Sequence, residues 1–209
     1  FITPNEYKNH RIEIMTEIKN QLDNEGHKAY IIPEGASNGV GSLGYVNTID
    51  EILEQEKEMG IKFDAIVVTV GSGGTYAGLY YGNRIKENSA TIYGFNICDS
   101  KEHFQNIVIN LLDEISIYTN KRIIVNKEEI DIIDGYLGLG YALNQPKEIE
   151  FIHSFAKLEG IILDPVYTGK AMYGLINEIK KGRFDKHQNI LFIHKGGSFG
   201  WNRVQRGLL

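Results

Sequence analysis

Five consecutive small residues (GSGGT, Gly71 to Thr75) directly follow the apolar run AIVVTV. Glycine permits left-handed backbone and close approach of a ligand, and a helical pattern starts at about Thr75. Backbone N–H groups and the hydroxyls of Ser72 and Thr75 would then converge at the amino end of a helix, where phosphate groups commonly bind. The segment therefore indicates an anion site, and a plain turn capped by a threonine is the alternative.

Common nucleotide-binding loops fit the chain poorly. GSGGT is not a Walker loop, because no Gly-Lys-Ser/Thr follows it, and GKA at 169–171 has alanine after its lysine. GVGSLG at 39–44 matches the dinucleotide fingerprint, but the segment PEGASN separates it from any preceding strand. The acidic residue about 20 positions further on is Asp64, which precedes its strand instead of ending it. We therefore disfavour NAD and expect a compact phosphate, such as that of pyridoxal phosphate.

Composition narrows the class of protein. The 209 residues carry a net charge of −5 with no basic stripe, which disfavours nucleic acid as a partner. The single cysteine, Cys98, excludes an internal disulfide and is typical of a reducing cytoplasm. We find no long uncharged apolar run, so we expect no membrane span, and we expect no metal site. Phe1 stands first in place of methionine, which is compatible with a fragment or a processed chain.

Strand and helix patterns alternate along most of the chain. A capping box at Thr3 and Glu6 predicts a helix that runs to Gly26. We expect strands at 28–32, 64–70, 91–97 and 189–194, and further helices at 45–59, 75–86, 103–118, 146–158 and 169–181. Residues 122–145 show neither the helical nor the strand period of apolar residues. Strands separated by helices of this length predict an α/β fold, with a mostly parallel twisted sheet and helices on both faces.

A second segment with chemical potential is LEGIILDPVYTGKAMYGL at 158–175, which places an acid, a proline, a tyrosine and a threonine just before a helix. A purely structural interpretation is that Asp164 and Pro165 form a turn and that Tyr167 is an amphipathic side chain that lines the wall of a cavity. Together with GSGGTYAGL, ILFIHKGG and PEGASNGVGSLGY, however, it resembles the D-cysteine desulfhydrase and 1-aminocyclopropane-1-carboxylate deaminase family. These are pyridoxal-phosphate enzymes of the tryptophan-synthase-β type, fold type II. The resemblance extends from about Pro4 to Gly197.

The resemblance implies a role for each motif residue. The cofactor phosphate would lie on Gly71, Ser72, Gly73, Gly74 and Thr75. Tyr167 would be catalytic, standing beside the substrate to transfer a proton or to handle the leaving group. Thr168 and Lys195 would approach the pyridine nitrogen. The substrate would lie near Ser37 and Asn38.

Two of these positions bear on the substrate. The residue after the tyrosine separates the subfamilies: the deaminases have a glutamate there, as in DPVYEGK, whereas this chain has Thr168, as the D-cysteine enzymes do. The resemblance therefore favours β-elimination from D-cysteine to pyruvate, hydrogen sulfide and ammonia. The deaminase is the alternative. D-cysteine enzymes usually have HTGG where this chain has HKGG. If the Lys195 ammonium lies at the pyridine nitrogen, it keeps the ring unprotonated and weakens the ring as an electron sink. Alternatively, the lysine side chain turns away from the ring or binds another group. Another β-substituted amino acid is then an alternative substrate.

One motif of the family is absent from these residues. The Schiff-base lysine lies in an N-terminal GGNK segment, followed by Ser-Asn-His, and neither segment occurs here. We therefore expect residues 1–209 to be the C-terminal portion of such a lyase, mainly its larger cofactor-binding domain, and to be inactive alone. An inactive cofactor-binding or phosphate-binding protein is a further hypothesis. The family expectation is a cytoplasmic homodimer that acts on a small amino acid.

Overall fold

The structure is a computed structural model, and it describes residues 1–201. The chain divides into two compact units, Phe1–Ala36 and a second unit that begins at Ser37. Among the described residues, no helix is long and apolar enough to cross a membrane. The sheet, the GSGGT loop, the DPVYT segment and the HKGG segment belong to the second unit.

The first unit consists of α1 (Pro4–Asn9), α2 (Arg11–Asn24) and the short 3₁₀ helix η1 (Glu34–Ala36). The predicted capping box is confirmed, since Glu6 donates its N–H to the Thr3 hydroxyl at 3.3 Å and accepts the Thr3 N–H at 2.6 Å. The single helix expected to reach Gly26 is instead two helices that meet at His10. The strand expected at 28–32 is wrong, because that segment is irregular and is not part of the sheet that the described residues form.

The second unit is built on a parallel sheet. Its strands are β1 (Ala65–Val70), β2 (Thr91–Asn96), β3 (Asp131–Ile133) and β4 (Ile190–Phe192), in the order β3-β2-β1-β4. All neighbouring pairs run parallel, and Ala65 lies opposite Thr91. The predicted α/β fold with a mostly parallel sheet is thus confirmed.

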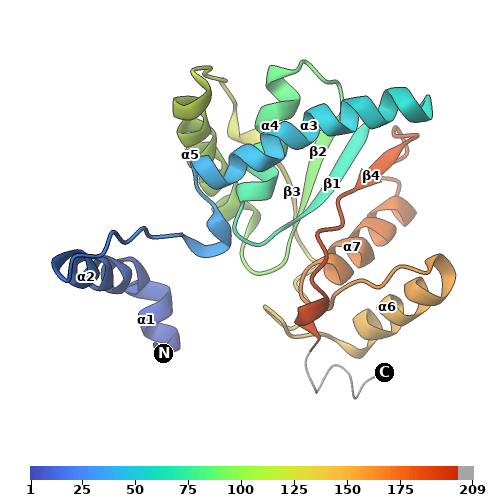
Figure 1. Cartoon of the computed structure of the whole chain (residues 1–209). Helices are drawn as coiled ribbons and strands as arrows, with labels where there is room; N and C mark the ends of the chain where they lie inside the picture. The colour runs from blue at the N-terminus through green and yellow to red at the C-terminus, as the bar shows by residue number, and fades with distance from the viewer. Residues whose placement is uncertain (202–209) are drawn as a thin grey trace. The chain divides into compact units, whose positions relative to one another are not determined.

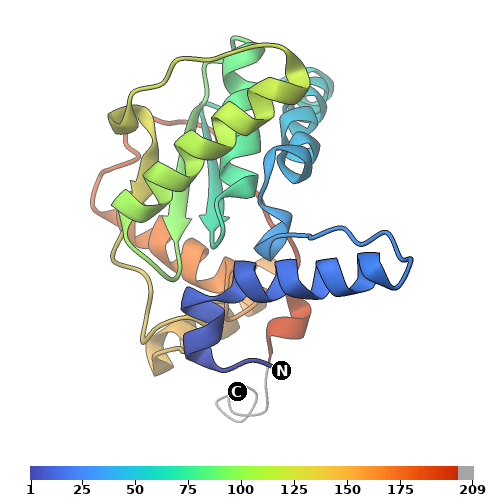
Figure 2. The same cartoon turned by 90° about the vertical axis from the view of Figure 1, so that its left-hand side faces the viewer.

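Helices cover both faces of this sheet (Figure 1). On one side are α3 (Gly39–Met59), α4 (Gly74–Ile85) and α5 (Lys101–Thr119), and on the other are α6 (Pro146–Glu159) and α7 (Thr168–Lys180). Figure 2 shows α5 lying over the face of the strands. The side chains of β1 alternate between the two layers: Ile66 and Val68 pack with α3, α4 and α5, and Val67 packs with α7. β1 is therefore a central strand that is buried on both faces.

The helix α3 begins six residues earlier than the pattern predicts. Asn38 caps it by accepting the N–H of Gly41 at 2.8 Å. The segment GVGSLG therefore forms the first turns of a helix, and it is not a tight turn after a strand. This geometry agrees with the exclusion of a dinucleotide fingerprint.

Parallel strands place their carboxyl ends at one edge of the sheet, where α/β proteins bind their ligands. The segments that leave this edge are GSGGT after β1, residues 97–100 after β2, the glycine-rich stretch after β3 and residues 193–197 after β4. The sheet thereby positions three separate parts of the chain around one loop.

Candidate cofactor-binding site

The GSGGT loop connects β1 to α4, as the sequence predicts. Gly73 is the amino-terminal cap of α4 and has a left-handed backbone with φ of 92°. The N–H of Gly74 donates to the Ser37 hydroxyl oxygen at 3.1 Å, and the Ser37 hydroxyl donates to Ser72 Oγ at 2.6 Å. An oxygen atom therefore already accepts a hydrogen bond at the amino end of this helix.

The loop also excludes side chains. A Cβ atom on Gly73 would lie 2.8 Å from Ile107 Cγ2, and one on Gly74 would lie 2.7 Å from Ser37 Oγ. Both distances are far below van der Waals contact, so only glycine fits at these positions without a shift of the neighbours. A backbone cradle with oxygen-seeking N–H groups at a helix amino end is the geometry that a phosphate requires. The residues present therefore fit the phosphate of pyridoxal phosphate.

Lys195 reaches this loop from the segment after β4. Its ammonium donates to the Thr69 carbonyl at 3.2 Å and to Thr75 Oγ1 at 3.3 Å. Partial burial lowers the pKa of Lys195 to about 8, and the Asp164 carboxylate opposes this shift. The contact with Thr75 places the ammonium beside the helix amino end. That Lys195 approaches the pyridine nitrogen stays a prediction.

The DPVYT segment forms a stiff turn held by one buried carboxylate. Asp164 accepts the N–H groups of Val166, Tyr167 and Thr168 at 2.8, 2.7 and 2.9 Å. The Thr168 hydroxyl donates to the same carboxylate at 2.6 Å and accepts the N–H of Asp164 at 2.9 Å. Thr168 is 1% exposed, and its hydroxyl closes the turn in this structure. Its role toward the pyridine nitrogen stays a prediction.

This turn directs Tyr167 at the phosphate loop. The Tyr167 atom Cε1 lies 3.4 Å from the position that a Cβ on Gly71 would take. Its hydroxyl forms a short hydrogen bond with the hydroxyl of Tyr141, and the two rings meet edge to face at 5.9 Å between centroids. Burial, followed by the hydrogen bond with Tyr141, raises the pKa of Tyr167. Its phenol therefore keeps its proton at neutral pH.

Tyr141 is the site residue that sequence reasoning missed. It belongs to the stretch GYLGLGYALN, whose alternating glycines show neither a helical nor a strand period. The available signal was a tyrosine in a glycine-rich loop, since loops on a rigid scaffold often carry functional side chains. Only the fold shows that this loop meets the DPVYT turn.

Lys170 anchors the loop that carries Tyr141. Its ammonium donates to the carbonyls of Leu137 at 2.7 Å and Gly140 at 2.5 Å, and the residue is 1% exposed. Burial lowers the pKa of Lys170, and the Glu148 carboxylate opposes the shift. The lysine of DPVYTGK thus supports the site through the neighbouring loop.

We expect Lys170→Met to destabilise the protein by about 1–3 kcal/mol, because two carbonyls lose their buried donor. Urea unfolding followed by circular dichroism measures this change. Lys180→Met removes an exposed lysine from the same helix and should change the stability by less than about 0.5 kcal/mol. Equal stability of the two variants would show that Lys170 does not hold the loop.

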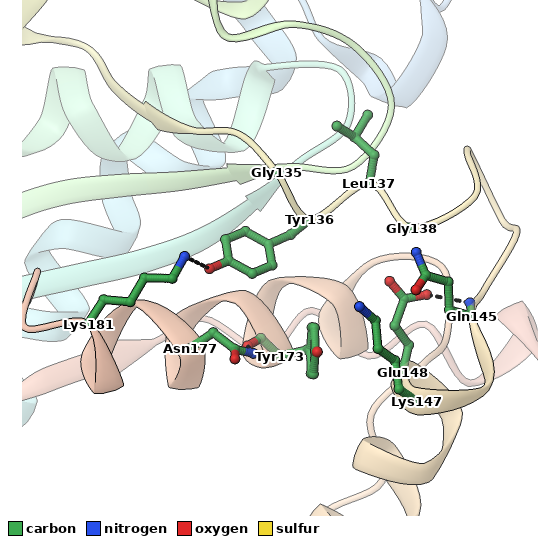
Figure 3. Close-up of a pocket in the computed structure, with 10 residues that line it drawn as sticks. All are labelled: Gly135, Tyr136, Leu137, Gly138, Gln145, Lys147, Glu148, Tyr173, Asn177 and Lys181. Atoms are coloured by element: carbon green, nitrogen blue, oxygen red, sulfur yellow. Dashed lines mark hydrogen bonds between the residues drawn. The ribbon is translucent and has the colours of Figure 1, made fainter.

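A separate pocket of about 270 Å³ lies beside α6 and α7 (Figure 3). Figure 3 shows Lys181 pointing at the Tyr136 hydroxyl, which it contacts at 3.1 Å. Tyr136 donates in turn to the buried carboxylate of Glu178 at 2.6 Å. None of the residues predicted for the cofactor or the substrate lines this pocket. We assign it no part in cofactor binding.

Comparison with known proteins agrees with the site. A family model described as pyridoxal-phosphate dependent enzyme matches residues 5–196. The bifunctional D-cysteine desulfhydrase/1-aminocyclopropane-1-carboxylate deaminase, mitochondrial, of Arabidopsis thaliana is 43% identical over 203 residues, which are 95% of this chain and 49% of that protein. A Thermotoga maritima protein named "putative 1-aminocyclopropane-1-carboxylate deaminase" is 37% identical over 211 residues, which are 100% of this chain and 64% of that protein.

A solved structure supports the same relationship. The crystal structure of an ACC deaminase homologue matches with a TM-score of 0.83 and 36% identity, covering 95% of this chain and 59% of that chain. The present chain thus spans between about half and two thirds of the length of the proteins it matches. The chain belongs to the family of pyridoxal-phosphate dependent enzymes, with pyridoxal phosphate as the cofactor that its GSGGT loop fits.

Proposed function

We propose that this chain forms the cofactor-binding part of a lyase that performs β-elimination on D-cysteine or a related β-substituted amino acid. The products from D-cysteine would be pyruvate, hydrogen sulfide and ammonia. The observation that carries the proposal is Tyr167, which the Asp164 turn holds against the phosphate loop with a phenol that keeps its proton. A phenol can give its proton to a departing sulfur only if neighbouring groups make that proton mobile, and the Tyr141 hydroxyl is hydrogen-bonded directly to it.

Different residues of the site would bind the phosphate, donate a proton and contact the substrate. The N–H groups of Gly73 and Gly74 and the hydroxyls of Ser72 and Thr75 would hold the phosphate at the amino end of α4. Pyridoxal phosphate supplies an electron sink for negative charge at the α-carbon of an amino acid. The Tyr167 hydroxyl would give its proton to the departing sulfur. Ser37 and Asn38, on the segment that leads into α3, would lie near the substrate.

The choice of D-cysteine rests on Thr168. A hydroxyl that is engaged with Asp164 cannot hold the pyridine nitrogen protonated as a carboxylate would, so the electron sink is milder. Expulsion of a β-thiolate needs less of this sink than opening of a cyclopropane ring. Deamination of 1-aminocyclopropane-1-carboxylate is the second candidate, and the names of the relatives support it. The cytoplasmic homodimer stays a prediction.

Steady-state assays of the complete holoenzyme, including the segment that carries the Schiff-base lysine, with D-cysteine, L-cysteine and 1-aminocyclopropane-1-carboxylate test the proposal. We expect kcat/KM for sulfide release from D-cysteine to exceed that for ammonia release from the cyclopropane substrate at least tenfold. A preference for the cyclopropane substrate despite Thr168 would establish the second candidate. Absence of turnover with all three substrates, together with retained cofactor, would identify an inactive cofactor-binding protein.

A further inference from the structure

The phosphate loop contains no cation of its own. GSGGT offers N–H groups and hydroxyls, whereas a phosphate monoester carries close to two negative charges at neutral pH. Many phosphate sites add a lysine or an arginine to the helix amino end. In this chain the fold brings a lysine to the loop from a point 120 residues further along the sequence.

The contacts of Lys195 leave capacity for a further acceptor. An ammonium group has three N–H donors. The Thr69 carbonyl and Thr75 Oγ1 account for two of them, and both acceptors are uncharged. Thr75 is the last residue of GSGGT and stands in the first turn of α4. The ammonium therefore lies at the phosphate end of the site.

The electrostatic potential around Lys195 also favours binding of an anion. The amino end of α4 carries the positive pole of the helix dipole, to which the ammonium adds its charge. Asp164 is the acidic group whose charge acts on Lys195, but its carboxylate is already committed to three N–H groups and one hydroxyl of its own turn. Burial lowers the pKa of the Lys195 ammonium, and the Asp164 carboxylate offsets this shift only in part.

We propose that Lys195 is a direct ligand of the cofactor phosphate and supplies the positive charge that the GSGGT loop lacks. This inference rests on the proposed function and refines it, since it assigns the lysine of HKGG to the phosphate and not to the pyridine nitrogen. The phosphate site of this chain is then formed by two segments, one after β1 and one after β4.

Two probes that form no Schiff base test the assignment: inorganic phosphate and pyridoxine 5′-phosphate. Their dissociation constants are measured by ³¹P NMR titration for the wild-type protein, Lys195→Met and Lys195→Arg. Lys157→Met removes one charge from an exposed position on α6 and is the matched control. We expect Lys195→Met to weaken both probes about 10- to 100-fold, the usual worth of a charged hydrogen bond. Lys195→Arg should recover part of the loss, and the control should stay within twofold of wild type.

Three results would overturn the proposal, and they are distinguishable. Unchanged binding of both probes to Lys195→Met would remove Lys195 from the site while leaving the proposed function intact. Weaker binding of pyridoxine 5′-phosphate with unchanged binding of inorganic phosphate would place the lysine at the ring. Failure of wild type to bind either probe would overturn the phosphate site itself, and the proposed function with it.

Discussion

Replacing Tyr167 with phenylalanine in the complete enzyme, which includes the Schiff-base lysine, is expected to lower kcat for sulfide release from D-cysteine by about 10²–10⁴-fold, the range for one acid–base group. The substitution removes the hydroxyl that bonds to Tyr141 and keeps the ring that lies against Gly71. The Asp164 turn uses only the backbone N–H of Tyr167, so the turn is retained. Loss of rate with unchanged cofactor affinity is the signature of a proton donor.

Steady-state kinetics and the absorbance of the bound cofactor measure the two quantities separately. Tyr173→Phe, on the helix α7 that Tyr167 caps but away from the phosphate loop, is the matched control and should keep kcat within about twofold. Tyr141→Phe removes only the partner hydroxyl and should give an intermediate loss. A Tyr167→Phe enzyme with nearly wild-type kcat would exclude the phenol as the proton donor and would redirect the search to Tyr141 or a water molecule.

The centre of the fold was predictable because local pattern and tertiary environment agree there. The strand expected at 64–70 is Ala65–Val70, and the helix expected from about Thr75 begins at Gly74. Both faces of β1 are buried, so a continuous apolar run is what its environment requires. Glycines next to such a strand then mark the turn.

Elsewhere tertiary packing overrode the local pattern. Glycine lowers helix propensity, and for that reason the first turns of α3 looked like a loop. In the fold, Gly39 packs so closely on Glu114 that a Cβ would lie 2.9 Å from that residue. A Cβ atom on Gly78 or Gly82 of α4 would likewise overlap a backbone oxygen of α3, that of Ser42 or that of Val46. These glycines serve the approach of helices, which no single-segment pattern records.

The partners of the candidate site were predictable only in part. The phosphate loop and the DPVYT turn each carry a motif, whereas the Tyr141 contact and the Lys195 contact join segments 26 and 120 residues apart. The parallel sheet explains the Lys195 contact, because the carboxyl ends of β1 and β4 meet at one edge, whereas Tyr167 lies in the segment between α6 and α7 and follows no strand. Sequence spacing alone does not reveal which loops that edge brings together.

The second large effect is expected from Gly73→Val, which should abolish measurable binding of pyridoxine 5′-phosphate. At φ of 92° a β-branched residue is strongly disfavoured, and its Cβ would lie 2.8 Å from Ile107 Cγ2 and 3.4 Å from Leu111 Cδ1. Both neighbours belong to α5, which is packed on the sheet, so the loop has to move instead. Movement of the loop turns the amino-terminal N–H groups of α4 away from the phosphate.

Two valine variants separate this effect from general strain. Gly60→Val places the same side chain at another left-handed glycine, φ of 66°, where nothing lies within 4 Å of the added Cβ. Gly44→Val adds it at an exposed helical position with open space around it. Both controls should lose some stability and keep the dissociation constant of the probe, measured by ³¹P NMR on samples whose circular dichroism shows the native fold. If Gly73→Val binds the probe as tightly as these controls, the N–H groups of the GSGGT loop do not hold the phosphate.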